Sequence, residues 1–206
     1  AKESKVGEVF IATPDQKIID VVKKYSGNAI LTKKNHFSGS DRVYEVYKNK
    51  FNDSVDLIIN LQGDMPNIKP EAILKLEHLM RSSKSDIGTL ASTLKNKDEI
   101  NDTNIVKVQV EDNLKNDNFL KAKDFFRIKN SPNIEKIYHH IGIYAFTKTA
   151  LTKYVNLSRS KLEIERNLEQ MRAMENDMTI NVGLHGSLPL GVDTREDLIK
   201  VSKEMN

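Results

Sequence analysis

The sequence predicts an α/β fold with a mainly parallel sheet. Up to about residue 80, short apolar segments alternate with longer segments whose apolar residues recur every three or four positions. From about residue 85, several strand-like segments follow one another with little helix between them. Residues 101–145 are therefore expected to form a small antiparallel lobe within a single domain that spans residues 1–206.

The first part of the chain supplies three strands and three helices. Each expected helix has a recognisable start: Pro14-Asp15, the polar loop around residue 38, and Pro70. The helix that begins at Pro70 carries Leu76 and other apolar residues at helical spacing. The expected strands are Val9–Thr13, which reads as buried, Asn28–Leu31 and Val55–Ile59.

The second part is richer in strands. Strand-like patterns occur in "DIGTLASTL", "NIVKVQVED", "NDNFLKAKDFF", "IYHHIGIYAFT" and "MTINVGL". Helices are expected over Lys148–Tyr154, over Lys161–Glu175 as one continuous helix, and over Thr194–Met205.

Composition excludes several classes of protein. The net charge of +3 is small and scattered, so nucleic acid is not expected as a partner. The absence of cysteine excludes disulfides and thiolate chemistry. No apolar run is long enough to span a membrane, and the N-terminal residues do not resemble a signal peptide, so a cytoplasmic protein is expected.

Polar clusters follow the ends of the expected strands, where open α/β sheets bind their ligands. In "NLQGDMP", Asp64 follows Gly63 and Gln62 directly after a strand. A carboxylate there suits Mg²⁺, which prefers one or two carboxylates together with phosphate oxygens and water. An ordinary turn aspartate before the Pro70 helix fits the stretch equally well.

Two further clusters carry the same ambiguity. Asp193 or Thr194 is expected to cap the last helix, although a capping carboxylate can also bind a metal. Ser38 and Gly39 precede a helix and offer a hydroxyl and free amides to an anion or nucleotide. Asp41 and Arg42 in the same loop read either as part of that site or as a surface pair.

Two stretches carry side chains suited to a polyhydroxylated ligand. His139 and His140 are adjacent on a strand and point to opposite faces, whereas His140 and Tyr144 share a face and could line one wall. In "LEIERNLEQMR", Glu169 and Gln170 could bind hydroxyl groups if their side of the helix faces a site; otherwise they are solvated helix residues.

Known nucleotide-binding signatures are missing. The sequence contains no GxxxxGK[ST] after a strand and no GxGxxG, which argues against P-loop and dinucleotide enzymes.

The clusters "HFSGSDR", "NLQGDMP", "NIVKV", "HHIGIY", "LEIERNLEQMR" and "GVDT" occur in the order found in the 3-deoxy-manno-octulosonate cytidylyltransferases. The chain resembles that family over nearly its whole length. The resemblance implies a Rossmann-like nucleotidyltransferase fold. It also implies a homodimeric, Mg²⁺-dependent enzyme that transfers CMP from CTP to 3-deoxy-D-manno-octulosonate (Kdo), releasing pyrophosphate and supplying lipopolysaccharide synthesis.

The resemblance also implies roles for individual residues. Asp64 and Asp193 would hold Mg²⁺ and act in catalysis. The sugar side would comprise Gln62, His140, Tyr144, Glu169 and Gln170, and the nucleotide side would comprise Ser38, Gly39, Asp41 and Arg42.

Three departures from the family pattern stand out. The basic loop of the type P-A-R-x-x-S-x-R-x-P-x-K, which grips the triphosphate in the family, has no counterpart in these residues, so this stretch alone is expected to turn over poorly. The family's Ala-Thr-Asp reads Ala12-Thr13-Pro14, which puts a nucleotide role for Asp15 in doubt. In the family, an arginine meets the sugar carboxylate. Its counterpart should fall near Phe119–Arg127, where Lys121, Lys123 and Arg127 are the candidates to take its place.

Two alternatives stay open at this point. One is transfer of CMP to another acidic sugar such as an acylneuraminate. The other is a catalytically silent relative that binds nucleotide or sugar, or serves as a dimerising scaffold.

Overall fold

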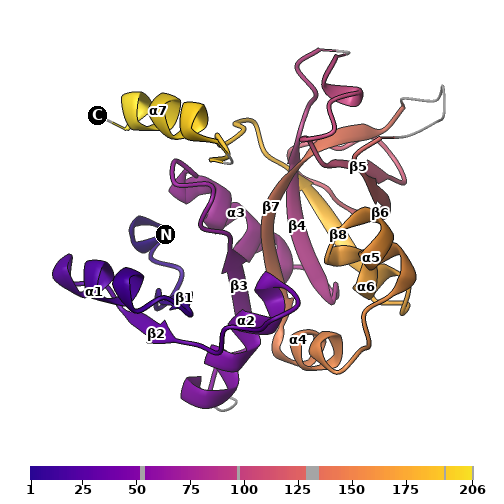
Figure 1. Cartoon of the computed structure of the whole chain (residues 1–206). Coiled ribbons are helices and arrows are strands. Elements are labelled where there is room, and N and C mark those ends of the chain that lie inside the picture. Colours follow the sequence, from indigo (N-terminus) through magenta and orange to yellow (C-terminus); the bar gives the residue numbers. More distant parts are fainter. Residues whose placement is uncertain (52–53, 97, 129–134, 193, 206) are drawn as a thin grey trace.

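The computed structural model describes residues 1–51, 54–96, 98–128, 135–192 and 194–205. A six-stranded mixed sheet in the order β3-β7-β4-β8-β6-β5 forms its centre, and a two-stranded parallel sheet of β1 and β2 lies apart from it (Figure 1). The strands are β1 (Ile11–Thr13), β2 (Ala29–Leu31), β3 (Leu57–Leu61), β4 (Ile87–Ser92), β5 (Lys107–Val110), β6 (Phe119–Phe126), β7 (Ile137–Thr147) and β8 (Ile180–Leu184).

Helices flank the main sheet, and one further helix packs on the β1–β2 sheet and forms the N-terminal unit with it. They are α1 (Gln16–Lys24), α2 (Gly39–Val46), α3 (Pro70–Arg81), α4 (Lys148–Val155), α5 (Lys161–Arg166), α6 (Gln170–Met174) and α7 (Arg195–Glu204), with the short turns η1 (Lys2–Ser4), η2 (Tyr47–Phe51) and η3 (Asp98–Ile100). The α2 helix continues directly into η2, which has π-helical geometry.

The alternation of β7 divides the core into two layers. Ile141, Ile143 and Ala145 pack with the apolar side of α3 on one face of the sheet. Tyr144 and Phe146 belong to the second cluster, which includes residues of α4 and α6 on the opposite face. The odd and even positions of one strand therefore bind different helices to the sheet.

Close packing of α3 depends on glycine in two adjacent strands. A Cβ at Gly88 would lie 2.6 Å from the Met80 sulfur, and one at Gly183 would lie 2.4 Å from a Leu79 methyl. A larger residue at either position would push α3 away from β4 and β8.

The expectation of a mainly parallel sheet is wrong. Among the described strands, β1–β2 and β4–β8 pair in parallel, whereas the other pairings are antiparallel. The reason is β7, which inserts between β3 and β4 and runs antiparallel to both. The pattern of local segments predicted the strands themselves but not this long-range insertion.

The strands within residues 101–145 belong to the main sheet. β5 pairs antiparallel with β6 and with the start of β7, while β6 pairs with β8. Since β7 also pairs with β4, these strands curl the sheet back on itself. The role of this region in dimerisation stays a prediction.

Two local predictions also need correction. The continuous helix expected over Lys161–Glu175 is broken: α5 ends at Asn167, whose φ of 51° is left-handed, and α6 starts at Gln170. The segment Val9–Thr13 was expected to be buried, yet Ile11 is 42% exposed, because β1 pairs only with β2 among the described strands.

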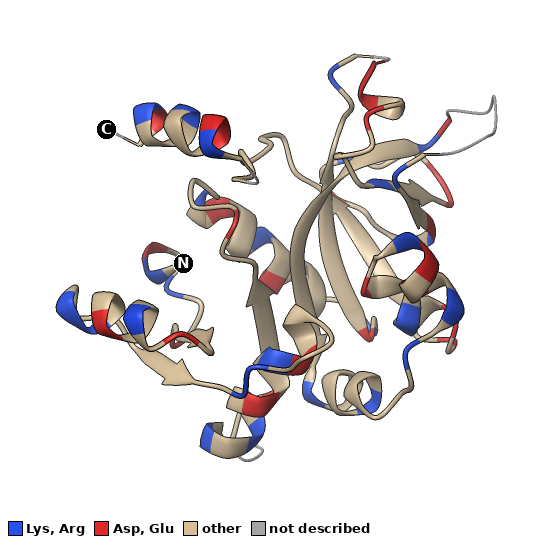
Figure 2. Cartoon of the chain, viewed as in Figure 1, with Lys and Arg blue, Asp and Glu red and all other residues tan. Residues whose placement is uncertain are grey.

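Charge is distributed over the outer helices without a dominant sign. Figure 2 shows Lys and Arg interspersed with Asp and Glu along the helices, while the strands of the main sheet are largely uncharged. No helix in the described ranges has both the length and the apolar character that crossing a bilayer requires.

Candidate active site

A cavity of about 220 Å³ opens at the centre of the main sheet. All five residues expected on the sugar side line it, as does Ser38 from the expected nucleotide side. The lining residues are Phe37, Ser38, Gln62, Val106, Arg127, His140, Gly142, Tyr144, Arg159, Glu163, Asn167, Leu168, Glu169 and Gln170.

The topology of β7 explains why a cavity forms there. One edge of β7 pairs with β4, and the other edge pairs with β5 at residues 137–139 and with β3 at residues 143–147. β3 and β5 therefore pair with different parts of the same edge of β7, and an interval of β7, residues 140–142, lies between the two paired parts. His140 and Gly142 lie in this interval, and Gln62 and Val106 flank it at the end of β3 and the start of β5.

His140 is held as a neutral imidazole. Its Nε2 lies 2.9 Å from the Thr89 hydroxyl, which itself donates to the Ile143 carbonyl at 2.7 Å. Since the hydroxyl has one proton, the tautomer that fits has a protonated Nε2 that donates to Thr89. The other ring nitrogen, Nδ1, is then an acceptor suited to a ligand hydroxyl.

Burial is the main reason that the pKa of His140 falls from its ordinary 6.5 to about 3, with a smaller contribution from His139. The unfolded chain then binds one proton more than the folded chain between these values, so stability falls as pH drops from 6.5 toward 3. His140→Gln is expected to flatten this slope by up to about 1.4 kcal/mol per pH unit. Urea unfolding at pH 4 to 7 measures the slope, with the exposed His78→Gln as a matched control. An unchanged slope in His140→Gln would show that the imidazole takes up its proton in the folded state.

The phenol of Tyr144 extends the same wall. Its ring centroid lies 5.5 Å from that of His140, as the spacing of four residues on one strand predicted. Burial and the charge of Glu169 raise the pKa of Tyr144 well above its ordinary value, so the hydroxyl stays protonated and can donate.

Glu169 connects the cavity to the loop before α2. Its carboxylate accepts hydrogen bonds from the main-chain N–H and the hydroxyl of Ser40, both at 3.2 Å. Burial raises the pKa of Glu169, and these bonds oppose the rise. Glu169 does not lie within one continuous helix as predicted, because it occupies the N-cap position of a separate helix, α6.

Gln170 carries an unsatisfied donor beside the cavity. The residue is only 5% exposed, and its Nε2 has no hydrogen-bond partner in the part of the chain that the structure describes. A buried amide without an acceptor costs about 1–3 kcal/mol, so such groups usually bond to protein, water or a ligand. The geometry therefore favours a ligand oxygen next to Gln170.

The loop of Ser38 and Gly39 is fixed by a buried ion network behind the cavity. Ser38 caps α2 by accepting from Asp41 N, and its hydroxyl donates to the Asp41 carboxylate at 2.8 Å. Asp41 in turn accepts from both terminal nitrogens of Arg172, at 2.9 and 3.1 Å. Gly39 lies against Asn60 and Glu169. Asp41 thus holds the loop in place and does not line the cavity.

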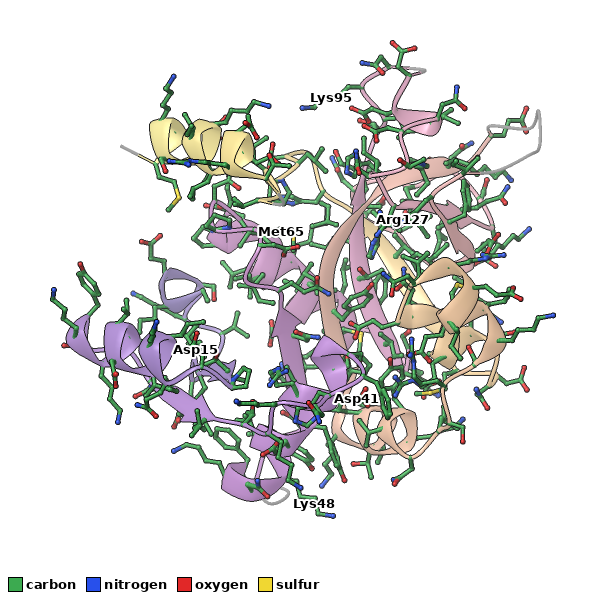
Figure 3. The ribbon with its side chains drawn as sticks, viewed as in Figure 1. Asp15, Asp41, Lys48, Met65, Lys95 and Arg127 are labelled. Atoms are coloured by element: carbon green, nitrogen blue, oxygen red, sulfur yellow. The ribbon has the colours of Figure 1, made fainter. Side chains whose placement is uncertain are left out.

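Arg42 and Asp15 also have structural partners. Arg42 donates to the Thr32 hydroxyl and to the carbonyls of Lys33 and Lys34, which braces the segment after β2. Asp15 caps α1 through Lys17 N and lies in the N-terminal unit, away from Arg127 (Figure 3). Neither residue lines the cavity.

Asp64 lies in an exposed turn between β3 and α3. Its carbonyl accepts from Val192 N at 2.8 Å, which brings the segment around residue 192 next to the turn. Asp193 lies outside the described residues. Thr194 caps α7 in a capping box with Asp197, as one of the two alternatives for this segment predicted.

Comparison with known proteins decides the family. Residues 1–180 match the family model described as "Cytidylyltransferase". The 3-deoxy-manno-octulosonate cytidylyltransferase of Bartonella tribocorum is 39% identical over 98% of this chain and 83% of its own length. The enzyme of that name from Rhizobium etli is 37% identical over 98% of this chain and 80% of its length. The chain belongs to the family of 3-deoxy-manno-octulosonate cytidylyltransferases.

Solved structures agree with this family. The CMP:2-keto-3-deoxy-manno-octonic acid synthetase complexed with CTP superposes with a TM-score of 0.85 at 33% identity, covering 97% of this chain and 81% of its own. A 4-diphosphocytidyl-2C-methyl-D-erythritol synthase from Anaerococcus prevotii shares the fold, with a TM-score of 0.64 at 18% identity over 99% of this chain and 84% of its own. The predicted nucleotidyltransferase fold is confirmed.

The structure also separates the three cations that could replace the arginine of the family. Arg127 lines the cavity, whereas Lys121 and Lys123 are exposed on β6 and do not line it. The Arg127 Nη1 donates to the carbonyls of Thr103 and Asn104, both at 3.0 Å. Of these three cations, Arg127 is therefore the one placed to meet a bound anion.

Sequence reasoning missed part of the lining. Arg159 and Phe37 stack at 5.6 Å, with Arg159 also bound to Glu163 at 3.1 Å. They come from different loops, so only the fold brings them together. Arg159 is one residue before the α5 cap, and no motif marked it as a site residue.

Asp64 offers one exposed carboxylate to a metal ion. No group of three or more His, Asp or Glu side chains in the described part of the chain could hold a metal alone. Mg²⁺ typically uses one or two carboxylates and completes its shell with phosphate oxygens and water. An exposed carboxylate such as that of Asp64 suits this mode of binding, in which the substrate supplies further ligands.

Proposed function

We propose that this protein transfers CMP from CTP to Kdo and releases pyrophosphate. The observation that carries the proposal is the TM-score of 0.85, at 33% identity, with a CMP:2-keto-3-deoxy-manno-octonic acid synthetase complexed with CTP. The relatives at 37–39% identity carry the name of the same activity. The side chains around the cavity match this substrate in their chemistry.

The cavity suits a sugar acid with several hydroxyl groups. The Arg127 guanidinium would bind the carboxylate of Kdo, because arginine offers paired donors in carboxylate geometry. Gln62 and Gln170 offer amide groups, and Tyr144 offers a hydroxyl donor. The acceptors for sugar hydroxyls are the Nδ1 of neutral His140 and the carboxylate of Glu169.

The reaction requires the sugar and the triphosphate to meet in one orientation. The anomeric hydroxyl of Kdo attacks the α-phosphorus of CTP, a new P–O bond forms, and the bond to pyrophosphate breaks. Such a displacement depends mainly on positioning and on neutralising phosphate charge. Ser38 and Gly39 at the start of α2 would help to bind the nucleotide, with Asp41 and Arg42 holding that loop in shape.

Asp64 and Asp193 would hold Mg²⁺. When bound, the ion would supply charge neutralisation at the α-phosphate and lower the pKa of the attacking hydroxyl. Asp64 lies in an exposed turn, which suits an ion that also binds phosphate oxygens and water.

The wider context follows from the same family. We infer that CMP-Kdo made here supplies lipopolysaccharide synthesis and that the enzyme is a cytoplasmic homodimer. Size-exclusion chromatography with light scattering would test the dimer.

Release of pyrophosphate from CTP tests the proposed function. The full-length gene product is expected to release pyrophosphate with Kdo and Mg²⁺, and to release little with an acylneuraminate. Pyrophosphate release with the acylneuraminate but not with Kdo would show that the acylneuraminate, and not Kdo, is the substrate. Absence of turnover with either acid, in a protein that folds and melts cooperatively, would indicate a catalytically silent relative.

A further inference from the structure

A completely buried lysine lies next to the cavity without lining it. Lys107, the first residue of β5, is 0% exposed. Its ammonium donates to the carbonyl oxygens of Asp102 and Ile105, both at 2.8 Å. A charge in this position is costly to bury, and burial lowers the pKa of Lys107.

The same loop holds the cation of the cavity. The carbonyls of Thr103 and Asn104, which lie between the two that Lys107 binds, accept from Nη1 of Arg127 at 3.0 Å each. Four consecutive carbonyls, those of residues 102–105, therefore bind two side-chain cations. We name residues 102–105 the carbonyl loop.

Further bonds make the carbonyl loop stiff. The Asp102 carboxylate accepts from Asn104 N at 2.8 Å, which closes a tight turn. The next residue, Val106, lines the cavity and accepts from His140 N at 2.9 Å. One end of the carbonyl loop is thus linked through Val106 to His140, the β7 residue that lines the cavity. The ammonium of Lys107 binds the carbonyl loop itself.

Charges of both signs act on Lys107. The Asp102 carboxylate raises the pKa of Lys107, whereas Arg127 lowers it, because the two positive charges repel each other across the loop. The carbonyl oxygens of the loop offset that repulsion by presenting negative dipole ends to both cations. Replacing Lys107 would remove the ammonium from two of these oxygens, of which the Asp102 carbonyl keeps a longer bond from Ile105 N at 3.3 Å, and would free the loop to shift.

We infer that Lys107 is a positioning residue, whose ammonium fixes the carbonyl loop so that the loop holds the Arg127 guanidinium against the carboxylate of the sugar acid. This inference rests on the proposed function, because it requires a sugar acid in the cavity. Lys107 itself does not touch the substrate. It acts through main-chain atoms, so the cluster "NIVKV", which contains Lys107, does not by itself indicate the connection.

A double-mutant cycle on the full-length gene product tests the inference. Lys107→Met keeps the aliphatic length and removes the ammonium. It is expected to raise the KM for Kdo roughly 10- to 100-fold and to leave the KM for CTP within about twofold, since displacement of a binding group by about 1 Å has effects of this size. In an Arg127→Ala background, Lys107→Met is expected to raise the KM for Kdo no further, because the group that it positions is gone.

Two variants control for stability and charge. Asp102→Ala removes an exposed carboxylate, its bond to Asn104 N and its attraction for the Lys107 ammonium, so it should fold normally and raise the KM for Kdo a few-fold. Lys115→Met removes an exposed lysine outside the cavity and should change neither KM. Melting temperatures of all variants show whether any fails to fold.

Each outcome has a separate meaning. Additive effects of Lys107→Met and Arg127→Ala, or equal changes in both KM values, would overturn the positioning role and leave Lys107 as a structural residue. If Lys107→Met does not fold, an unchanged KM for Kdo in Asp102→Ala would overturn the positioning role of Lys107. Failure of the wild-type protein to use Kdo would instead refute the proposed function.

Discussion

Asp64→Asn is expected to reduce pyrophosphate release by about a thousandfold or more while changing the melting temperature by no more than about 2 °C. The change replaces a carboxylate by an amide of nearly the same shape. It removes the negative charge that the proposed Mg²⁺ site needs, because hard cations bind carboxylates far better than neutral amides. Steady-state turnover with CTP and Kdo, measured beside thermal unfolding, gives both numbers.

The expected stability follows from the place of Asp64 in the fold. The residue is exposed, and a structural bond in the turn, from Val192 N at 2.8 Å, goes to its main-chain carbonyl. That bond survives in Asp64→Asn. The exposed Asp117→Asn removes a carboxylate outside the cavity and should leave turnover unchanged.

Binding of Mn²⁺ in the presence of CTP, followed by electron paramagnetic resonance, separates metal binding from activity. Asp64→Asn should weaken this binding at least about tenfold, because the ion loses a charged ligand. If Asp64→Asn instead unfolds easily and keeps its turnover, Asp64 is a structural turn residue and the metal lies elsewhere.

Local structure was largely predictable from the sequence because each element carries its own signal. The strand Ile137–Thr147 was expected with the same bounds, and Pro70 begins α3 as predicted. The order of strands was not predictable from local patterns. β7 lies between β3 and β4 because of packing across the whole sheet, and no local pattern in the sequence indicates this position.

The candidate active site was likewise predictable only where a local pattern indicates it. Alternation along β7 predicted that His140 and Tyr144 share a wall, and both line the cavity. The continuous helix through Glu169 was wrong because Asn167 adopts a left-handed conformation that helical periodicity cannot reveal. That break turns Glu169 toward Ser40, 129 residues earlier in the chain. Contacts of this kind depend on tertiary structure and lie beyond any motif.

The ion network around Arg172 leads to the largest expected loss of stability. Arg172 is 1% exposed and binds both Glu163, at 2.7 and 2.9 Å, and Asp41. Its guanidinium also stacks on Tyr154 at 4.4 Å. Burial alone would lower the pKa of Arg172, but the bonds to Glu163 and Asp41 raise it above its ordinary value, so the group stays charged. The network joins the α2 loop to α5 and α6.

Arg172→Met is therefore expected to cost about 3–5 kcal/mol of unfolding free energy, since it takes the Arg172 cation from two shielded carboxylates and leaves Glu163 with the half-exposed Arg159. In a protein of this length that corresponds to a fall in melting temperature of roughly 10 °C or more. Urea unfolding monitored by circular dichroism measures the loss. Arg81→Met is the matched control, because Arg81 pairs with Asp56 and Glu77 at an exposed site and its removal should cost less than about 1 kcal/mol.

A neutral version of the network distinguishes an unpaired charge from lost packing. The triple variant Arg172→Met, Glu163→Gln and Asp41→Asn removes the two stranded carboxylates together with the cation. It is expected to recover much of the stability that Arg172→Met loses, because replacing a buried ion network as a whole is often nearly neutral. Its turnover should remain low, since the Ser38 loop loses the charged anchor that Asp41 provides. Equal instability of the triple and single variants would assign the loss to the packing of Arg172 on Tyr154 instead.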